Sequence, residues 1–154
     1  MTTMLQRIRG KIMTVLVLLL LTVAVLSVSS CRTPKLGVVN GTLLPCPPRP
    51  NCVCSQHSAD DNTIAPLAAV EADATWLRLR EILASWPRTE IIEETDSYLR
   101  AVVVTPLLRF RDDVEFLLDR DAGCIQVRSA SRVGYSDLGV NRRRIEQLRT
   151  RLSE

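Results

Sequence analysis

Two stretches in the C-terminal half hold most of the residues that could take part in chemistry. They read RFRDDVEF (109–116) and RSASRVGYSDLGVNRRR (128–144), and they combine guanidinium groups, carboxylates and hydroxyls. Such groups bind anions, form internal ion pairs or, as paired carboxylates, act as acid and base. The candidate ligand-binding residues are Arg128, Arg132, Arg142, Arg144, Asp112, Asp113, Glu115, Ser129, Ser131 and Tyr135.

The alternation of apolar and polar residues links the two stretches. If the apolar residues of both predicted strands face the core, Glu115 and Arg128 face the opposite side of the sheet. With Phe116 opposite Val127, Glu115 lies directly across from Arg128. With the strands shifted by two residues, Asp113 takes that place. Either register gives Arg128 a carboxylate partner on the uncovered face of the sheet.

Three consecutive arginines, 142–144, crowd the first turn of the predicted last helix. Cations there are disfavoured by about 0.3–1 kcal/mol each, so something must compensate them. Asp137 near the cap and the carboxylates of the predicted hairpin could do so. A bound anion could too, because Gly134, Ser136 and Gly139 allow backbone N–H groups to converge at a helix start. Two interpretations follow: an internal arginine–carboxylate network, or a site for an anion or polar head group.

Enzymatic chemistry has weaker support. The serines of 128–144 have no nearby base, because the only histidine, His57, lies in a predicted loop. The carboxylates of 109–116 could serve as acid and base, but arginines on the same face would keep them ionised. Tyr135 is expected to pack at a rim. Asp112-Asp113 lacks calcium-loop spacing and the C-x5-C-x-C pattern of 46–54 lacks zinc-site spacing. We predict no catalytic residue, metal or cofactor.

The elements that position these residues can be read from periodicity. Apolar residues recur at helical spacing from 71 to 86, where Asp73 or Thr75 could cap the helix and Pro87 ends it. A second helix is predicted over 140–152. Strands are predicted over 89–94, 98–105, 113–118 and 124–130. This order predicts an α+β two-layer sandwich, with an antiparallel four-stranded sheet and two helices on one face.

Residues 1–30 have the pattern of an export signal. Three basic residues precede an apolar run over 12–26, and small residues follow. The tetrapeptide Val28-Ser29-Ser30-Cys31 resembles a bacterial lipobox, which predicts a lipoprotein acylated, for example with palmitate, at Cys31. The alternatives are an uncleaved anchor helix over 12–28, at the short end of the roughly 17–25 residues that span a bilayer, and cleavage with release.

Charge excludes one class of partner. Residues 31–154 carry 17 basic and 17 acidic residues, so their formal net charge is zero and no global field favours nucleic acid. Of those basic residues, 16 are arginine and one is lysine, Lys35. Arginine offers a planar fork for carboxylates and phosphates. We therefore expect fixed ion pairs or anion binding by arginine.

Residues 31–63 are rich in proline and polar residues and are predicted to form a tether and a cysteine-rich loop, leaving 64–154 as the α+β domain. With Cys31 acylated, an even number of cysteines remains in an oxidising compartment, which favours disulfides. Three connectivities are possible for Cys46, Cys52, Cys54 and Cys124. We favour Cys46–Cys52 and Cys54–Cys124.

Three stretches, PCPPRPNCVCSQ, LRFRDDVEFLL and IQVRSASRVGYSDLGVNRRRIEQLR, resemble the bacterial and plastid family known as domain of unknown function 1499. The resemblance covers Leu36 to Leu152. It implies no cofactor and no catalytic residue, and it agrees with export because members are commonly exported or membrane-associated. Cys54 stands where the family usually has serine, and Cys46 and Cys52 match the family. This departure also favours Cys54 and Cys124 as partners.

Two functions are compatible with the sequence. The first is a non-enzymatic envelope lipoprotein that binds an anionic ligand, a lipid head group or a partner protein through the arginine-lined end of the sheet. The alternative is a hydrolase of envelope material that uses Asp112, Asp113 or Glu115. We expect the chain to be exported and held by a membrane on the periplasmic side. In a Gram-negative host, Arg32 after the acylated cysteine favours the outer membrane, because aspartate there signals inner-membrane retention.

Overall fold

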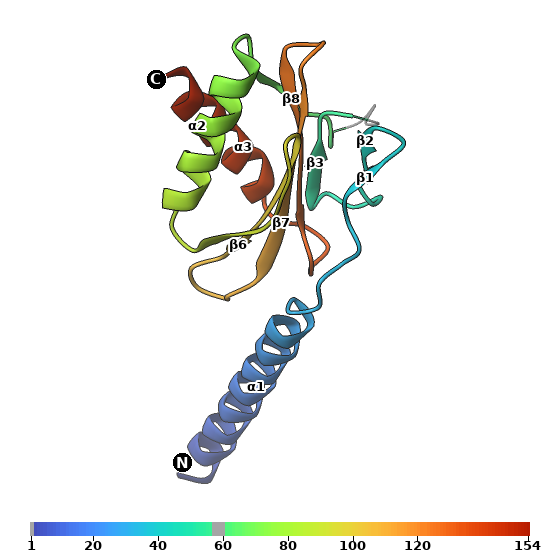
Figure 1. The fold of residues 1–154 in the computed structure, drawn as a ribbon. Coiled ribbons are helices and arrows are strands. Elements are labelled where there is room, and N and C mark those ends of the chain that lie inside the picture. The colour runs from blue at the N-terminus through green and yellow to red at the C-terminus, as the bar shows by residue number, and fades with distance from the viewer. Residues whose placement is uncertain (1, 57–60) are drawn as a thin grey trace.

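The computed structural model describes residues 2–56 and 61–154, so His57 lies outside the described residues. The chain begins with a long helix, α1 (Thr2–Ser29), which projects away from the rest of the molecule (Figure 1). Within it, Gln6–Ser29 is long and apolar enough to cross a membrane. The apolar 18-residue stretch within this segment is 0% buried in the protein. An N-terminal apolar helix of this kind is compatible with an export signal or an anchor.

The centre of the domain is an antiparallel sheet of six strands in the order β3-β8-β7-β6-β5, with β4 also pairing with β8. The four long strands lie where the alternation predicted them. The strands are β3 (Cys52–Cys54), β4 (Leu67–Ala68), β5 (Thr89–Glu94), β6 (Tyr98–Val104), β7 (Arg111–Asp119) and β8 (Cys124–Ser131). The α+β class and the antiparallel pairing are confirmed.

Two helices, α2 (Ala72–Ser85) and α3 (Val140–Ser153), cover one face of the sheet (Figure 1). Their buried leucines and isoleucine form one core cluster with the inward-facing residues of β6, β7 and β8. Phe116 is the largest side chain in this core that is fully buried. Neither predicted capping residue bonds the start of α2: Glu71 is the cap residue and makes no side-chain hydrogen bond, and Asp73 pairs with Arg120 instead.

The other face of the sheet is covered by residues 30–43, which follow α1 and which we call the covering chain. It contains a small hairpin, β1 (Val38–Val39) and β2 (Thr42–Leu43), on the side of the sheet away from the helices (Figure 1). Asn40 and Gly41 both have positive φ, 51° and 77°, as a two-residue hairpin turn requires. Leu43 is buried. The prediction that this face is uncovered is therefore wrong.

The prediction of a four-stranded sheet is also wrong. The additional strands β3 and β4 have three and two residues, and both pair with β8. Residues 31–63, for which we expected a tether and loop, contain β1, β2 and β3. Strands of two or three residues are too short to show an alternation of apolar and polar residues in the sequence. Their position depends instead on the long strand beside them.

Candidate functional site

The register of β7 and β8 decides where the charged residues meet. Phe116 lies opposite Val127, and Glu115 lies opposite Arg128. The first of the two predicted registers is therefore confirmed. Arg128 Nη1 donates to Glu115 Oε2 at 2.9 Å, and both side chains are buried. Asp113 faces Ala130 across the strands, so its charge must be balanced by other residues.

Asp113 is balanced by two arginines at once. Arg100, on β6, donates from Nε and Nη2 to Asp113 Oδ1 at 3.1 and 2.7 Å. Arg132, just after β8, donates to Asp113 Oδ2 at 2.7 Å and to Oδ1 at 2.9 Å. Asp113 is 1% exposed. These three side chains and the Arg128–Glu115 pair form a buried ion-pair network between the sheet and the chain that covers it.

The covering chain contributes directly to this network. Gly37 N donates to Glu115 Oε1 at 3.0 Å, and Arg100 Nη2 donates to the Pro34 carbonyl at 3.2 Å. Tyr98 O–H also donates to Glu115 Oε1 at 3.0 Å. Burial, followed by the neighbouring Glu115 charge, raises the pKa of Tyr98 well above its ordinary value of 10.0. Glu115 therefore accepts from three separate groups and has no open side.

A second buried cluster lies on the helix-covered face. Arg144 on α3 forms an ion pair with Asp112 and donates to Ser129 Oγ at 2.9 Å and to Asn141 Oδ1 at 2.6 Å. Asn141 Nδ2 donates to the Asn51 carbonyl at 3.0 Å. All five residues are buried. The two asparagines were missed by sequence reasoning, because nothing in their spacing separates a buried polar link from a surface asparagine.

The other arginines at the start of α3 also have internal partners. Arg142 donates to the Asp61 and Thr63 carbonyls at 2.6 and 2.8 Å, and Arg143 donates to the Leu138 carbonyl at 2.8 Å. Asp137 accepts from the backbone N–H groups of 139 and 141 at 2.9 and 2.8 Å. An acidic residue near the cap thus compensates the helix dipole, as predicted.

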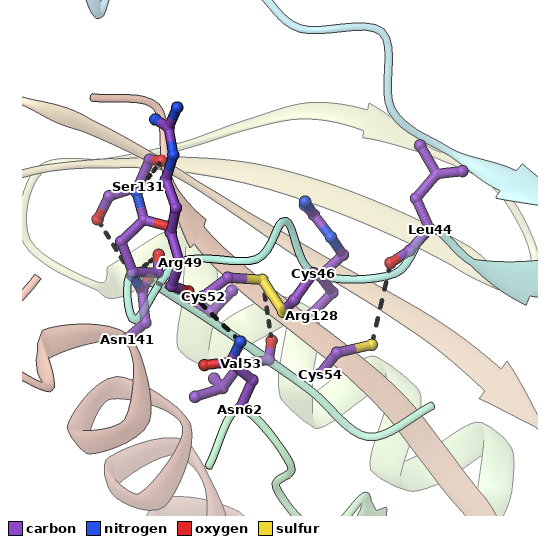
Figure 2. Close-up of a disulfide and its surroundings, with 12 residues drawn as sticks. Leu44, Cys46, Arg49, Cys52, Val53, Cys54, Asn62, Arg128, Ser131 and Asn141 are labelled. Atoms are coloured by element: carbon purple, nitrogen blue, oxygen red, sulfur yellow. Dashed lines mark hydrogen bonds between the residues drawn. A yellow bond between two sulfur atoms is a disulfide. The ribbon is translucent and has the colours of Figure 1, made fainter. Parts of the chain in front are cut away.

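The sulfur atoms follow the prediction only in part (Figure 2). Cys46 and Cys52 form a disulfide with an S–S distance of 2.00 Å, which confirms that pair. Cys54 and Cys124 are free, so the second predicted pair is wrong. Cys54 lies opposite Arg128, four residues from Cys124 along β8. That separation is about 13 Å at roughly 3.3 Å per residue, beyond the ~7 Å that a disulfide can bridge.

The three free thiols differ in their surroundings. Cys54 is fully buried and points to the Leu44 carbonyl (Figure 2), and burial raises the pKa of its thiol. Burial, followed by the charge of Asp119, also raises the pKa of Cys124. Cys31, the predicted acylation site, is exposed, and Arg111 Nη1 lies 2.6 Å from its Sγ. No group of three metal-ligating side chains occurs in the described ranges.

A cavity of about 330 Å³ lies between two loops, 105–110 and 132–139. We call it the loop pocket. Its walls are mostly apolar, and two of the predicted polar residues, Asp112 and Ser131, also line it. The lining residues are Thr105, Pro106, Leu107, Leu108, Phe110, Asp112, Ser131, Val133, Gly134, Ser136, Asp137, Leu138 and Val140.

The two loops that line the loop pocket lie at the end of the domain that meets α1 (Figure 1), which we call the α1-proximal end. Ser27 Oγ on α1 donates to the Leu108 carbonyl at 2.9 Å, and Arg132 Nη1 donates to the Ser30 carbonyl at 3.1 Å. Leu107 and Leu138 are 87% and 84% exposed. Tyr135 is also exposed at this end, so the expectation that it packs at a rim is wrong. The sequence signal for this site was the presence of leucines between the predicted strands and before the last helix, and sequence reasoning missed it.

The predicted site residues are thus divided among four places, and Tyr135 is exposed at the α1-proximal end. Asp113, Glu115, Arg128 and Arg132 lie in the ion-pair network; Ser129 and Arg144 lie in the second cluster; Arg142 bonds to backbone carbonyls. Asp112 belongs to the second cluster and also lines the loop pocket, as Ser131 does. The arginines are therefore occupied by internal partners.

Comparison with known proteins agrees with the sequence resemblance. No curated protein and no solved structure matches this chain. The sequence model of one family matches residues 42–152, which include all of β3 to β8, α2, α3 except its last residue, the ion-pair network and the loop pocket. Since this match spans more than half of the 154 residues, the chain belongs to the family described as protein of unknown function (DUF1499).

Proposed function

We propose that this chain is a non-enzymatic module of the cell envelope, held at a membrane by its N-terminal segment, that binds membrane lipid at its α1-proximal end. The observation that carries this proposal is the position of the exposed leucines. Leu107 and Leu138 are almost fully exposed at the end of the domain to which α1 is bonded. Exposed apolar side chains beside a pocket mark sites for apolar partners.

This end is turned toward the membrane in both predicted modes of attachment. If α1 spans the bilayer, its last turn and the following residue contact Leu108 and Arg132, so the two loops lie at the bilayer surface. If the chain is cut before Cys31 and acylated there, the lipid attaches beside Arg111, which begins β7 directly after loop 105–110. We place the domain on the periplasmic side, as a lipoprotein of the outer membrane in a Gram-negative host.

The other functions that the sequence allowed have less support. A free anion at the arginines would have to displace Asp113 or Glu115, each of which already accepts bonds from at least two groups. A hydrolase needs a carboxylate that a substrate can reach. Asp113 and Glu115 are buried under the covering chain, and Asp112, the one of the three that lines the loop pocket, is ion-paired to Arg144 and has neither of the other two as a second carboxylate there.

Fluorescence quenching tests this proposal. The full chain is reconstituted into phospholipid vesicles that contain lipids brominated on the acyl chains, and a tryptophan is introduced at Leu107. Quenching of the added fluorescence, after subtraction of the native Trp76 and Trp86 signal, is expected for Leu107→Trp. The matched control is Val70→Trp. Val70 is 93% exposed, and its neighbour Ala69 bonds to Gly123 at the opposite end of the sheet.

The two positions are comparably exposed in the protein, so only their distance from the bilayer separates them. The expected result is strong quenching at position 107 and little at position 70. Equal quenching at both positions, or none at position 107, would show that the α1-proximal end does not contact lipid, and the proposal would be abandoned.

A further inference from the structure

The polar atoms inside the loop pocket indicate what kind of molecule it accepts. Resting on the proposed function, we infer that the loop pocket takes an amphiphile whose alkyl chain ends in a neutral hydroxyl group, with Asp112 and Ser131 as its hydrogen-bonding partners. The inference depends on one buried oxygen atom, on the hydroxyl beside it and on the apolar walls around both.

The buried oxygen is Asp112 Oδ1. Asp112 is 1% exposed, and its other oxygen, Oδ2, receives the bond from Arg144 Nη2. Oδ1 has no hydrogen-bond partner among the residues that the structure describes. Buried polar atoms almost always have a partner, and a charged acceptor needs one most. Because Asp112 lines the loop pocket, a donor for Oδ1 can come from a molecule bound there.

Ser131 supplies the complementary group. Its Oγ accepts from Asn141 Nδ2 at 3.1 Å, and within the described part of the chain its own O–H is donated to no residue. Ser131 lies opposite Asp112 in the register of β7 and β8, and both residues line the loop pocket. A ligand hydroxyl could donate to Asp112 Oδ1 and accept from Ser131 Oγ at the same time.

Charge excludes the common anionic head groups from this position. The cation nearest to Asp112, Arg144, is already shared among Asp112, Ser129 and Asn141. A carboxylate or phosphate beside Oδ1 would face a like charge and could donate no hydrogen bond in its ionised form. The neutral hydroxyl is the simplest group that satisfies both Oδ1 and Ser131.

The walls and the volume set the rest of the ligand. Leu107, Leu108, Phe110, Val133 and Val140 are apolar, so they suit an alkyl chain. The volume of about 330 Å³ is about twice that of an apolar cavity that holds benzene, roughly 150 Å³. A short chain fits inside, and a longer one can continue past Leu107 and Leu138 toward the bilayer.

The test compares three small probes of similar size: 1-hexanol, 1-methoxypentane and hexanoate. The ether has as many heavy atoms as the alcohol but no donor. Each probe is titrated at a known free aqueous concentration into the full chain in lipid nanodiscs, with ¹³C-labelled valine methyl groups. Val133 and Val140 report on the loop pocket, and Val39, exposed in the turn region of β1 and β2, reports on non-specific binding.

The expected result is that 1-hexanol shifts the methyl signals of Val133 and Val140 and binds about tenfold or more tightly than the ether and hexanoate. Loss of one hydrogen bond to a buried charged group causes a change of this size. The Asp112→Asn variant should lose the preference for alcohol over ether. If this variant does not fold, the three-probe comparison on the natural chain decides alone.

Each other outcome overturns the inference. Equal affinity for alcohol and ether would show that Asp112 Oδ1 selects nothing, preference for hexanoate would show an anion site, and the absence of any shift would show that the pocket is closed to such molecules. These failures differ from failure of the proposed function, because quenching at Leu107→Trp reports contact with the bilayer whether or not the pocket binds a hydroxyl.

Discussion

Replacing Glu115 by glutamine is expected to destabilise the domain strongly. The side chain is fully buried, and the change keeps its shape but removes the charge that balances Arg128. Arg128 is 6% exposed, and its Nε already lacks a partner among the described residues. Removing one member of a buried ion pair costs about 3–5 kcal/mol, because the remaining charge is left uncompensated. That is a large part of the roughly 5–15 kcal/mol that stabilises a domain.

The assay is urea unfolding of the full chain in detergent micelles, followed by tryptophan fluorescence from Trp76 and Trp86. The matched control is Glu146→Gln, which breaks the Arg149–Glu146 pair on α3. In that pair the two side chains are 32% and 51% exposed, so the loss should be only about 0–1 kcal/mol. The double variant Glu115→Gln with Arg128→Met should recover part of the loss, because no buried cation then remains unpaired.

The reasoning would be refuted if Glu115→Gln and Glu146→Gln reduced the free energy of unfolding by the same small amount. It would also be refuted if Arg128→Met lowered the free energy of unfolding by the same amount in the Glu115→Gln variant as it does in the natural chain. Either result would mean that Glu115 and Arg128 do not act as a pair in the folded domain.

Three further predictions follow from the sulfur atoms and from Tyr98. Removing the Cys46–Cys52 disulfide with two alanines should lower the free energy of unfolding by about 2 kcal/mol, the loop-closure value for a separation of 6 residues, as measured by urea unfolding. In the folded chain, maleimide should not label Cys54, which is 0% exposed, and mass spectrometry should find it labelled only after unfolding; labelling of folded protein contradicts its burial. Folding raises the pKa of the Cys54 thiol above 9.0 and that of the Tyr98 hydroxyl above 10.0. The stability that these groups contribute is therefore fully present below pH 9 and is lost as the pH rises. Cys54→Ala and Tyr98→Phe should each flatten the decline of the free energy of unfolding at alkaline pH, and an unchanged decline would refute this assignment.

Much of the sheet could be predicted from the sequence, because residues in the long strands alternate with a period of two. That alternation placed Glu115 and Arg128 on one face and reduced their pairing to two registers. It could also have placed Arg100, which lies between the buried residues Leu99 and Ala101 on β6. Sequence reasoning did not name Arg100, since β6 reads as a continuous apolar strand with one arginine in it.

The parts that could not be predicted depend on long-range contacts. Strand β3 has only three residues, and its register against β8 separates Cys54 from Cys124 by too great a distance for a disulfide. The loop pocket depends on loop conformations that include positive φ angles at two residues other than glycine, Arg109 at 57° and Leu138 at 54°. Such angles are unfavourable for most residues, so sequence propensity does not predict them.

The measurement that tests the central claim most directly is native mass spectrometry of the full chain released from its own membrane, which detects any molecule that stays bound. Val133→Trp fills the loop pocket, and Val39→Trp makes the same change at an exposed position outside it. We predict an apolar, hydroxyl-bearing adduct on the natural chain and on Val39→Trp, and its loss from Val133→Trp. The same adducts on all three chains, or none on any of them, would contradict lipid binding at the loop pocket.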